Sequence, residues 1–260
     1  MNTRTWRVSA WLCGFTVACF CSIALNAQMA EVKEKPAMYS YIASWEIPRA
    51  HWGEMEKSNA GDKAVLEKAL ADGTLVGYGD DEAAVHQPGS GTHDNWWSAM
   101  SIAGLMKVLE ALSASGSSTT PVLESATKHW DDIMVSRYYN WRSGSYKGAY
   151  TRVASYKLKA DAPDDALDTL SKQMVAPLLE KLLADGTILE YEIDTQAIHT
   201  TDPSRFWIIY VSQSAEGLDK VNAAIREMAK QQPLHGSAFG ALTDSSDHRD
   251  ELIRGEGAFK

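Results

Sequence analysis

The sequence predicts an α+β fold made of two β-α-β-β-α-β units that pack sheet to sheet. Two observations lead to this prediction. A thirteen-residue segment that begins at Leu66 recurs 113 residues later with nine identical positions, and each copy lies within the same order of strand-like and helix-like segments. An apolar content of 45% is sufficient for a sizeable core, which excludes wholesale disorder.

The internal similarity extends well beyond this segment. Residues 104–108 match residues 217–221 at the same offset, and residues 129–134 resemble residues 248–253, so the two halves also end alike. Such self-similarity is typical of an ancient duplication within one chain.

The first half alternates between strand and helix patterns. Residues 39–47 are aromatic and β-branched, which is typical of a strand. Leu66, Ala69 and Leu70 lie on one helical face, and Gly73 follows where a helix C-cap is expected. We expect strands at 39–47, 75–86, 95–102 and 133–141, and helices at 62–72 and 105–112.

The second half repeats this order. Pro163 suits the first turn of a helix, whereas Pro177 must kink or split the same helix. We expect helices at 163–185 and 217–231, strands at 150–158, 188–199 and 205–212, and a weaker terminal strand.

Each unit would carry two helices on one sheet face, and the other face must be covered; two units in tandem supply that cover. Over residues 38–260, this element order and duplication resemble the dimeric α/β-barrel superfamily, with two ferredoxin-like units fused in one chain. That superfamily includes antibiotic-biosynthesis-type monooxygenases, muconolactone-isomerase-like, EthD-like and NIPSNAP-like proteins, and haem-handling members. The resemblance implies an intramolecular barrel, and no catalytic motif of these families carries over residue by residue.

The N-terminal segment 1–27 is typical of a secretory signal peptide. Arg4 and Arg7 precede an apolar run over residues 8–25, and Ala27 marks the expected cleavage site. We therefore expect an exported protein, periplasmic or secreted, with a first repeat at 36–145 and a second at 146–260. The alternative is an uncleaved membrane anchor, because the run is near the lower length limit for a membrane span.

Cleavage would remove every thiol, because Cys13, Cys19 and Cys21 all lie in this segment. The mature chain would then have no disulfide and no cysteine nucleophile. The net charge of −9 would become −11, from 23 basic and 34 acidic residues. This charge argues against nucleic acid and against membrane binding after signal cleavage, and we expect a monomer or homodimer.

Aromatic residues are concentrated in the first half, which predicts an aromatic-lined pocket there for an apolar or aromatic small molecule. His51 and His93 are the candidate general bases. The alternative is that these aromatic residues form an ordinary core. The predicted ligand-binding residues are Tyr41, Trp45, Trp52, Trp97, His86 and His199.

A His-x-Asp motif occurs once in each half. His129 with Asp131, and His248 with Asp250, would each share one face of a strand and are weak candidates for metal ligation. The alternative is a turn or strand-start motif in which the aspartate caps backbone amides. The acidic run at residues 80–82 is expected to face solvent.

These observations lead to one function and two alternatives. We expect a small-molecule-binding protein or a cofactor-independent enzyme, monooxygenase-like or isomerase-like, with no cofactor. The first alternative is a non-enzymatic structural or interaction module, and the second is haem or metal handling through the paired histidines.

Overall fold

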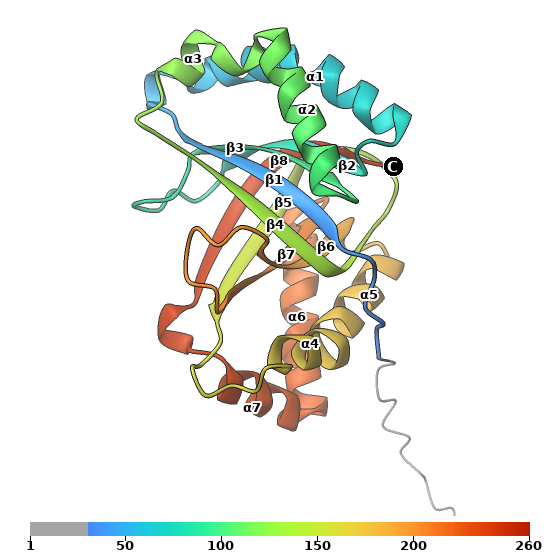
Figure 1. Cartoon of the computed structure of the whole chain (residues 1–260). Coiled ribbons are helices and arrows are strands. Elements are labelled where there is room, and N and C mark those ends of the chain that lie inside the picture. Colours follow the sequence, from blue (N-terminus) through green and yellow to red (C-terminus); the bar gives the residue numbers. More distant parts are fainter. Residues whose placement is uncertain (1–30) are drawn as a thin grey trace, which may run out of the picture.

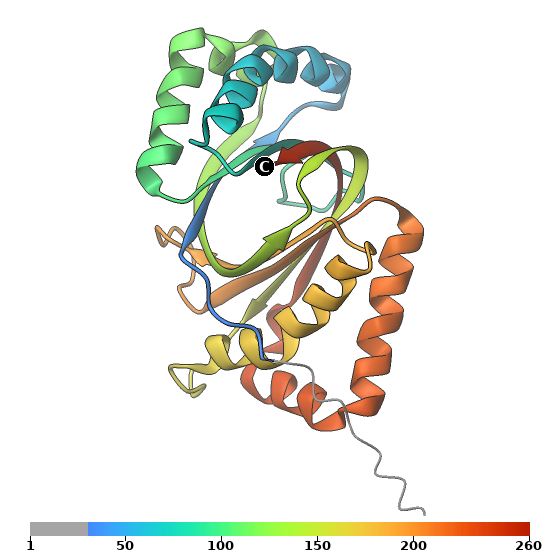
Figure 2. The same cartoon turned by 90° about the vertical axis from the view of Figure 1, so that its right-hand side faces the viewer.

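A computed structural model describes residues 31–260, so the predicted signal peptide and its three cysteines lie outside the described residues. Eight strands form one closed antiparallel barrel (Figures 1 and 2). The strands are β1 (Met38–Glu46), β2 (Gly77–Ala83), β3 (His93–Ala99), β4 (Lys128–Trp141), β5 (Gly144–Lys157), β6 (Glu190–Gln196), β7 (Arg205–Ser212) and β8 (Arg249–Phe259).

Helices flank the barrel on two opposite sides, as the quarter turn between Figures 1 and 2 shows. On one side lie α1 (Trp52–Asp72), α2 (Ile102–Ser115) and α3 (Pro121–Glu124). On the other side lie α4 (Ala166–Leu170), α5 (Ala176–Ala184), α6 (Ala215–Gln231) and α7 (Pro233–Leu242). Within residues 31–260, no helix is long and apolar enough to cross a membrane.

The order of strands around the ring is β1-β3-β2-β8-β5-β7-β6-β4. Strands β1 to β4 are therefore neighbours, as are strands β5 to β8. The two groups join edge to edge, because β2 pairs with β8 and β4 pairs with β6. The predicted pair of sheets thus face each other across the interior and also close into one ring.

Helix starts differ more from expectation than helix ends. Gly73 ends α1 in the left-handed region with φ of 82°, as predicted. Helix α1, however, begins ten residues before the predicted start. The sequence does not indicate these extra turns, because residues 52–61 are mostly polar and only Met55 and Ser58 among them are buried. Polar turns of this kind carry no apolar periodicity to read.

Pro177 splits the second-half helix, as expected. Helix α4 ends at Leu170, a single π-helical turn covers Ser171–Val175, and α5 starts at Ala176. A proline has no N–H to donate to the preceding turn, and a widened turn lets the chain continue without that hydrogen bond. Helix α7 was not predicted from the sequence.

The outward faces of the strands form the two main cores, each under one helix layer. The first core contains Tyr41 and Trp97 packed with Leu105, and the second contains Tyr191 and Phe206; all five are buried. Because side chains alternate along a strand, the remaining residues of the same strands point into the barrel.

Candidate functional site: a cavity inside the barrel

The barrel encloses a cavity of about 260 Å³, and every strand contributes to its wall. The loop between β2 and β3 adds Gly89, Ser90 and Gly91. A cavity formed by all the strands of a barrel, rather than by one half of the chain, is the largest difference from the pocket expected in the first half.

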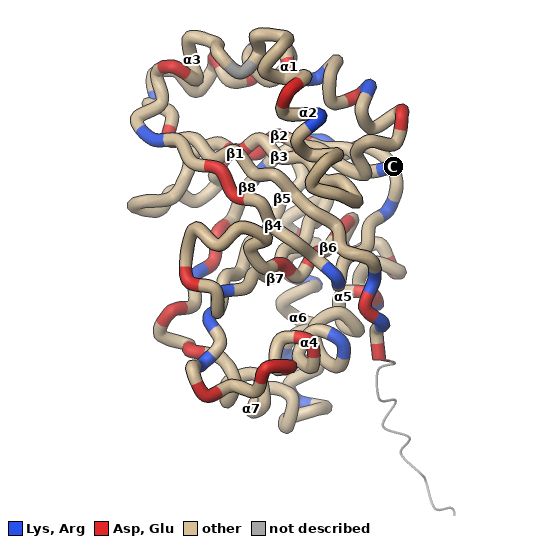
Figure 3. Tube along the Cα trace, viewed as in Figure 1, with Lys and Arg blue, Asp and Glu red and all other residues tan. Residues whose placement is uncertain are grey.

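Carboxyl groups dominate the polar part of this wall. Among the described residues that line the cavity, none is a lysine, arginine or histidine. Figure 3 shows that acidic residues occur along the strands of the barrel as well as on the helices. The acidic residues of the lining are Asp81, Asp94, Asp132, Glu190, Glu192, Asp194 and Glu251.

Three of these carboxyl groups come from one strand. Glu190, Glu192 and Asp194 occupy alternate positions of β6 and therefore share its inner face. Their exposed fractions are only 2%, 7% and 1%. Burial raises the pKa of Glu192 to about 7, and it raises the pKa of Glu190 and Asp194 well above the ordinary range.

A second acidic pair lies on adjacent strands, where Asp81 of β2 is in register with Asp94 of β3. Trp96 Nε1 donates to Asp81 Oδ2 at 3.0 Å, and Ser44 Oγ donates to Asp94 Oδ1 at 2.5 Å. Burial raises the pKa of Asp94 to about 6 and that of Asp81 well above its usual range. The acidic run at residues 80–82 is therefore not wholly solvent-facing, since Asp81 is 8% exposed.

Several polar atoms of the wall have no hydrogen-bond partner within residues 31–260. They are Asp81 Oδ1, Glu190 Oε1, both carboxyl oxygens of Asp194 and the hydroxyl of Tyr146. Buried polar groups in proteins are nearly always paired, and those without a protein partner often face water or a ligand.

Glycines make the space that these inward side chains occupy. A Cβ atom at Gly255 would lie 1.8 Å from Asp81 Oδ1, and one at Gly257 would lie 2.7 Å from the Tyr146 hydroxyl. The strand β8 therefore needs glycine at these alternate inner positions, because its neighbours project across it.

Aromatic side chains complete the wall. The ring of Trp96 lies 5.5 Å from that of Phe259, which also stacks on Tyr146 at 6.2 Å. Trp130 and Trp207 are only half-buried, and strand register places them opposite Ser44 and Asp194, toward the end formed by the loop at Gly89 to Gly91. The cavity thus has acidic and aromatic surfaces together.

The predicted pocket residues lie on the other side of the sheet. Tyr41 and Trp97 stack at 4.4 Å within the core under α1 and α2, and neither lines the cavity. Trp45 packs against His129, and Trp52 Nε1 donates to the Ile47 carbonyl at 2.9 Å. Strand alternation points the rings of Tyr41, Trp45 and Trp97 outward, and Trp52 lies at the start of α1, so these side chains belong to the packed side of the sheet, as the alternative interpretation expects.

The candidate bases also lie outside the cavity. His51 directly precedes α1, is half-buried, and has its Nδ1 atom 3.3 Å from Glu54 Oε1. His93 is buried at the start of β3, where its ring meets Trp52 edge to face. Burial, with the nearby charge of His86, lowers the pKa of His93 to about 4.

The two predicted ligand-binding histidines lie in loops. His86 follows β2, which ends at Ala83 rather than continuing to residue 86, and its ring contacts Trp52. His199 follows β6 and is exposed. Neither histidine lines the barrel cavity.

The His-x-Asp motif of the first half joins two strands. The Nδ1 atom of His129 donates to the Ser44 carbonyl at 3.0 Å, and the ring stacks on Trp45 at 3.6 Å. Asp131 is 3.4 Å from His129 Nε2. The imidazole, rather than the aspartate, binds the backbone here.

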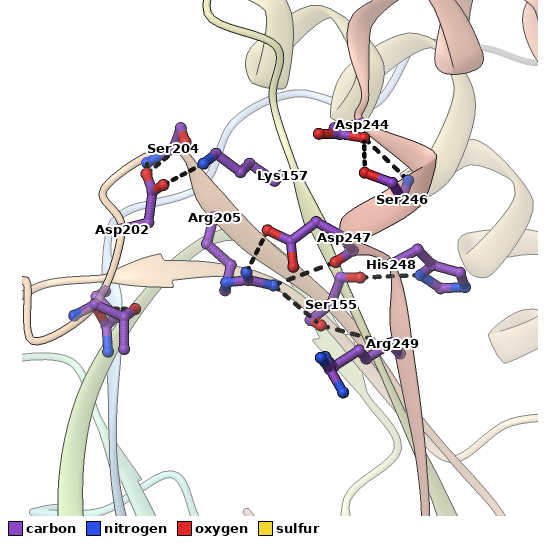
Figure 4. Close-up of polar contacts among 12 residues, drawn as sticks. Ser155, Lys157, Asp202, Ser204, Arg205, Asp244, Ser246, Asp247, His248 and Arg249 are labelled. Atoms are coloured by element: carbon purple, nitrogen blue, oxygen red, sulfur yellow. Dashed lines mark hydrogen bonds and ion pairs between the residues drawn. The ribbon is translucent and has the colours of Figure 1, made fainter.

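The second motif repeats this geometry, and Figure 4 shows its contact between His248 and Ser155. His248 Nδ1 is 2.9 Å from the Ser155 carbonyl, Nε2 is 3.4 Å from Asp250, and the ring stacks on Tyr156 at 4.3 Å. Within the described part of the chain, no three His, Cys, Asp or Glu side chains are arranged to hold a metal ion. In both motifs the histidine joins two neighbouring strands through a hydrogen bond to a backbone carbonyl, which is a structural role.

The sequence contains two signals for the acidic wall. The segment Glu-Tyr-Glu-Ile-Asp at 190–194 alternates acidic and apolar residues, which is the pattern of a strand with one solvent-facing side. In a closed barrel that side is the interior. The glycines at 77, 79, 255 and 257 are the second signal, because paired alternate glycines indicate close approach across a sheet.

Comparison with known proteins gives structural likeness alone. No family model and no curated protein sequence matches the chain. A candidate monooxygenase from Lactobacillus acidophilus NCFM is similar over 86% of this chain and 96% of its own, with a TM-score of 0.61 and 11% identity.

Two further solved structures show the same architecture. An anthrone oxidase-like protein has a TM-score of 0.54 and 13% identity, over 85% of this chain and 92% of its own. A candidate monooxygenase from Fusobacterium nucleatum subsp. nucleatum has a TM-score of 0.57 and 7% identity, over 87% and 95%. Together with the closed eight-strand ring, these likenesses confirm that the chain has a dimeric α/β-barrel fold.

Proposed function

We propose that this protein binds a small molecule inside the barrel, as a binding protein or a cofactor-independent enzyme. The observation that carries the proposal is the cavity inside the barrel, with buried carboxyl oxygens that have no partner within the described residues. Small-molecule sites are typically concave, largely apolar and supplied with a few convergent polar groups. Here the apolar part is aromatic and the polar part is acidic.

Acid–base chemistry is the reaction class that the wall favours. The raised pKa values of Glu192, about 7, and Asp94, about 6, place these groups where they can both accept and release a proton near neutral pH. A proton transfer of the isomerase kind needs such a carboxyl group and no cofactor. Two of the structural neighbours are described as candidate monooxygenases, and they too point to small-molecule substrates.

Haem is a poor fit to this cavity. Its wall contains no histidine or cysteine among the described residues, and the two haem propionates would add negative charge beside seven carboxyl groups. His129 and His248 each use one ring nitrogen on a backbone carbonyl.

The test combines a ligand panel with a variant that fills the cavity. Val153 lines the cavity, so Val153→Phe should remove space, whereas Val85→Phe changes an exposed loop residue and serves as the matched control. Compounds that raise the Tm of the unaltered chain should also raise that of the control variant, and should lose their effect on Val153→Phe. Equal stabilisation of both variants would place the site elsewhere. No stabilisation by any compound would favour the structural or interaction module instead.

We further propose export and duplication. Residues 1–27 would be a cleaved signal peptide, and residues 36–145 and 146–260 would be the two copies of one unit. The orders of their helices and strands, β1-α1-β2-β3-α2-α3-β4 and β5-α4-α5-β6-β7-α6-α7-β8, support the duplication. Mass spectrometry of the intact exported protein tests signal cleavage, and we expect a chain that starts at Gln28.

A further inference from the structure

We propose that the ligand of the barrel cavity is an organic cation with N–H donors and an apolar group, of the class of protonated aryl-alkyl amines. This inference rests on the proposed function, since it names the ligand class for the same cavity. It is carried by the charge of the wall, by its unpaired acceptors and by its aromatic faces.

The charge of the wall is of one sign. Seven of the eight strands contribute hydroxyl or carboxyl groups to the wall, and β7 contributes no titratable group. The hydroxyl groups include those of Ser40 and Ser44 of β1 and of Tyr146 of β5. The carboxyl groups are those of Asp81 of β2, Asp94 of β3, Asp132 of β4, Glu190, Glu192 and Asp194 of β6, and Glu251 of β8. No basic side chain of the described lining offsets these carboxyl groups. An anionic ligand would be repelled by those carboxyl groups that are ionised. A cation would instead favour ionisation of Glu190 and Asp194, whose pKa values burial has raised.

The unpaired acceptors indicate what the ligand must bring. Asp81, Glu190 and Asp194 are each more than nine-tenths buried, and each has a carboxyl oxygen without a hydrogen-bond partner in residues 31–260. A buried carboxyl group without partners is costly. An ammonium group has three N–H donors and one positive charge. It can therefore donate hydrogen bonds to the unpaired carboxyl oxygens and balance a negative charge on them.

The aromatic faces select an organic cation over a bare metal ion. Trp96, Trp130, Trp207 and Phe259 line the same cavity, and indole faces attract cations and pack against apolar groups. No trio of metal-ligating side chains converges in the described chain. The cavity therefore offers stacking surface and acceptors at once, which matches an amine attached to a ring.

The pH dependence follows from the carboxyl groups. Burial raises the pKa of Glu192 to about 7 and of Asp94 to about 6, so these groups are partly protonated near neutral pH. A cation binds best to their ionised forms, whereas an alkylamine remains protonated up to about pH 10. Affinity for an amine should therefore rise between pH 6 and pH 8, with release of protons on binding.

Three probes of nearly equal shape test the inference by titration calorimetry on the mature chain: 2-phenylethylamine, 2-phenylethanol and 3-phenylpropionate. At pH 8 the amine should bind at least about tenfold more tightly than the alcohol, which is the factor expected from one charged hydrogen bond. That preference should shrink at pH 6, and the propionate should not compete.

Variants identify the residues responsible. Asp194→Asn keeps the shape of the side chain but cannot ionise beside a bound cation, so it should lose the preference for the amine while keeping affinity for the alcohol. Asp164→Asn, at an exposed position outside the cavity, is the matched control and should behave as the unaltered chain. Glu190→Gln repeats the test should Asp194→Asn fail to fold.

The outcomes separate this inference from the proposed function. Equal or tighter binding of the alcohol or the propionate would overturn the cation inference while leaving the barrel a small-molecule site. An amine preference that Asp194→Asn and Glu190→Gln both retain would also overturn it. No binding by any of the three probes would overturn it as well, and the wider ligand panel then decides separately on the proposed function.

Discussion

The two faces of the same strands differ sharply in composition and packing. Outward residues such as Phe206 and Trp97 are large, apolar and closed in by helices, whereas inward residues such as Glu192 and Asp81 are acidic and surround a cavity. One residue of shift along a strand changes a side chain from one environment to the other. The comparison teaches that stability and the candidate site are carried by alternate positions of one set of strands.

The largest expected effect separates the two faces by packing. Phe206→Ala should lower the free energy of unfolding by about 3–5 kcal/mol, because it leaves a hole in a fully packed core. Ile209→Ala, on the inner face of the same strand and already beside a cavity, should cost less than about 2 kcal/mol, since fewer contacts are lost. Urea unfolding of both variants measures this. Equal costs would contradict the division into a packed face and a hollow one.

The next effect concerns the space inside the barrel. Gly255→Ala should destabilise the protein by about 1–3 kcal/mol, because its Cβ would overlap Asp81 and the backbone of Asp80. Gly236→Ala in α7 is the control, where nothing lies within 4 Å, and alanine should stabilise that helix by about 0.5–1 kcal/mol. Thermal unfolding distinguishes them. A Gly255→Ala variant with the Tm of the unaltered chain would show that the glycine at this inner position is not required for space.

A third effect has a defined pH dependence. Because the pKa of Glu192 is raised to about 7 in the folded protein, the folded state holds its proton more tightly than the unfolded state does. Ionising Glu192 therefore lowers the free energy of unfolding. This loss is absent below about pH 4, grows as pH rises and is complete above the pKa of the folded state. Glu192→Gln should therefore be more stable than the unaltered chain by about 1–3 kcal/mol at pH 8, and nearly equal to it at pH 4.

Urea unfolding at the two pH values measures this difference. Glu110→Gln, on the exposed face of α2, serves as the control and should show the same small difference at both. A Glu192→Gln variant with no advantage at pH 8 would mean that the carboxyl group is stabilised in its charged form.

The smallest effect compares the two His-x-Asp motifs. His129→Phe and His248→Phe keep a stacked ring but remove the hydrogen bond to a strand carbonyl, so each should cost about 1 kcal/mol. The two losses should agree closely, since the geometries repeat. A fall in Tm on addition of a chelator, abolished by either substitution, would instead indicate a metal site at these motifs.

The fold was predictable because its signals are local and repeated. The segment at residues 66–78 and its copy at residues 179–191 fix a strand and a helix in each half, and Pro177 fixes a break that the structure also has. The site was not predictable in the same way. Whether Tyr41 or Ser40 faces the interior depends on ring closure, which pairs β2 with β8 and β4 with β6 across the whole chain.

The same long-range pairing separates the predicted lining residues from the cavity. The aromatic residues of the first half predict a pocket because rings are frequent in pockets, yet Trp97 and Tyr41 point toward the helices. The alternating acidic residues of β6 do not by themselves indicate a cavity, because alternating charge usually faces water. Only the closed ring turns that face inward.

Ring closure has a consequence for assembly. Within the described chain every strand has two neighbours, so no backbone edge is left to recruit another strand. Cutting the chain between β4 and β5 would leave each half with two unpaired edges, at β2 and β4 or at β8 and β6. Those edges are complementary, so separately produced halves should recombine into the original ring, or each half should pair with its own copy to form a symmetric dimer.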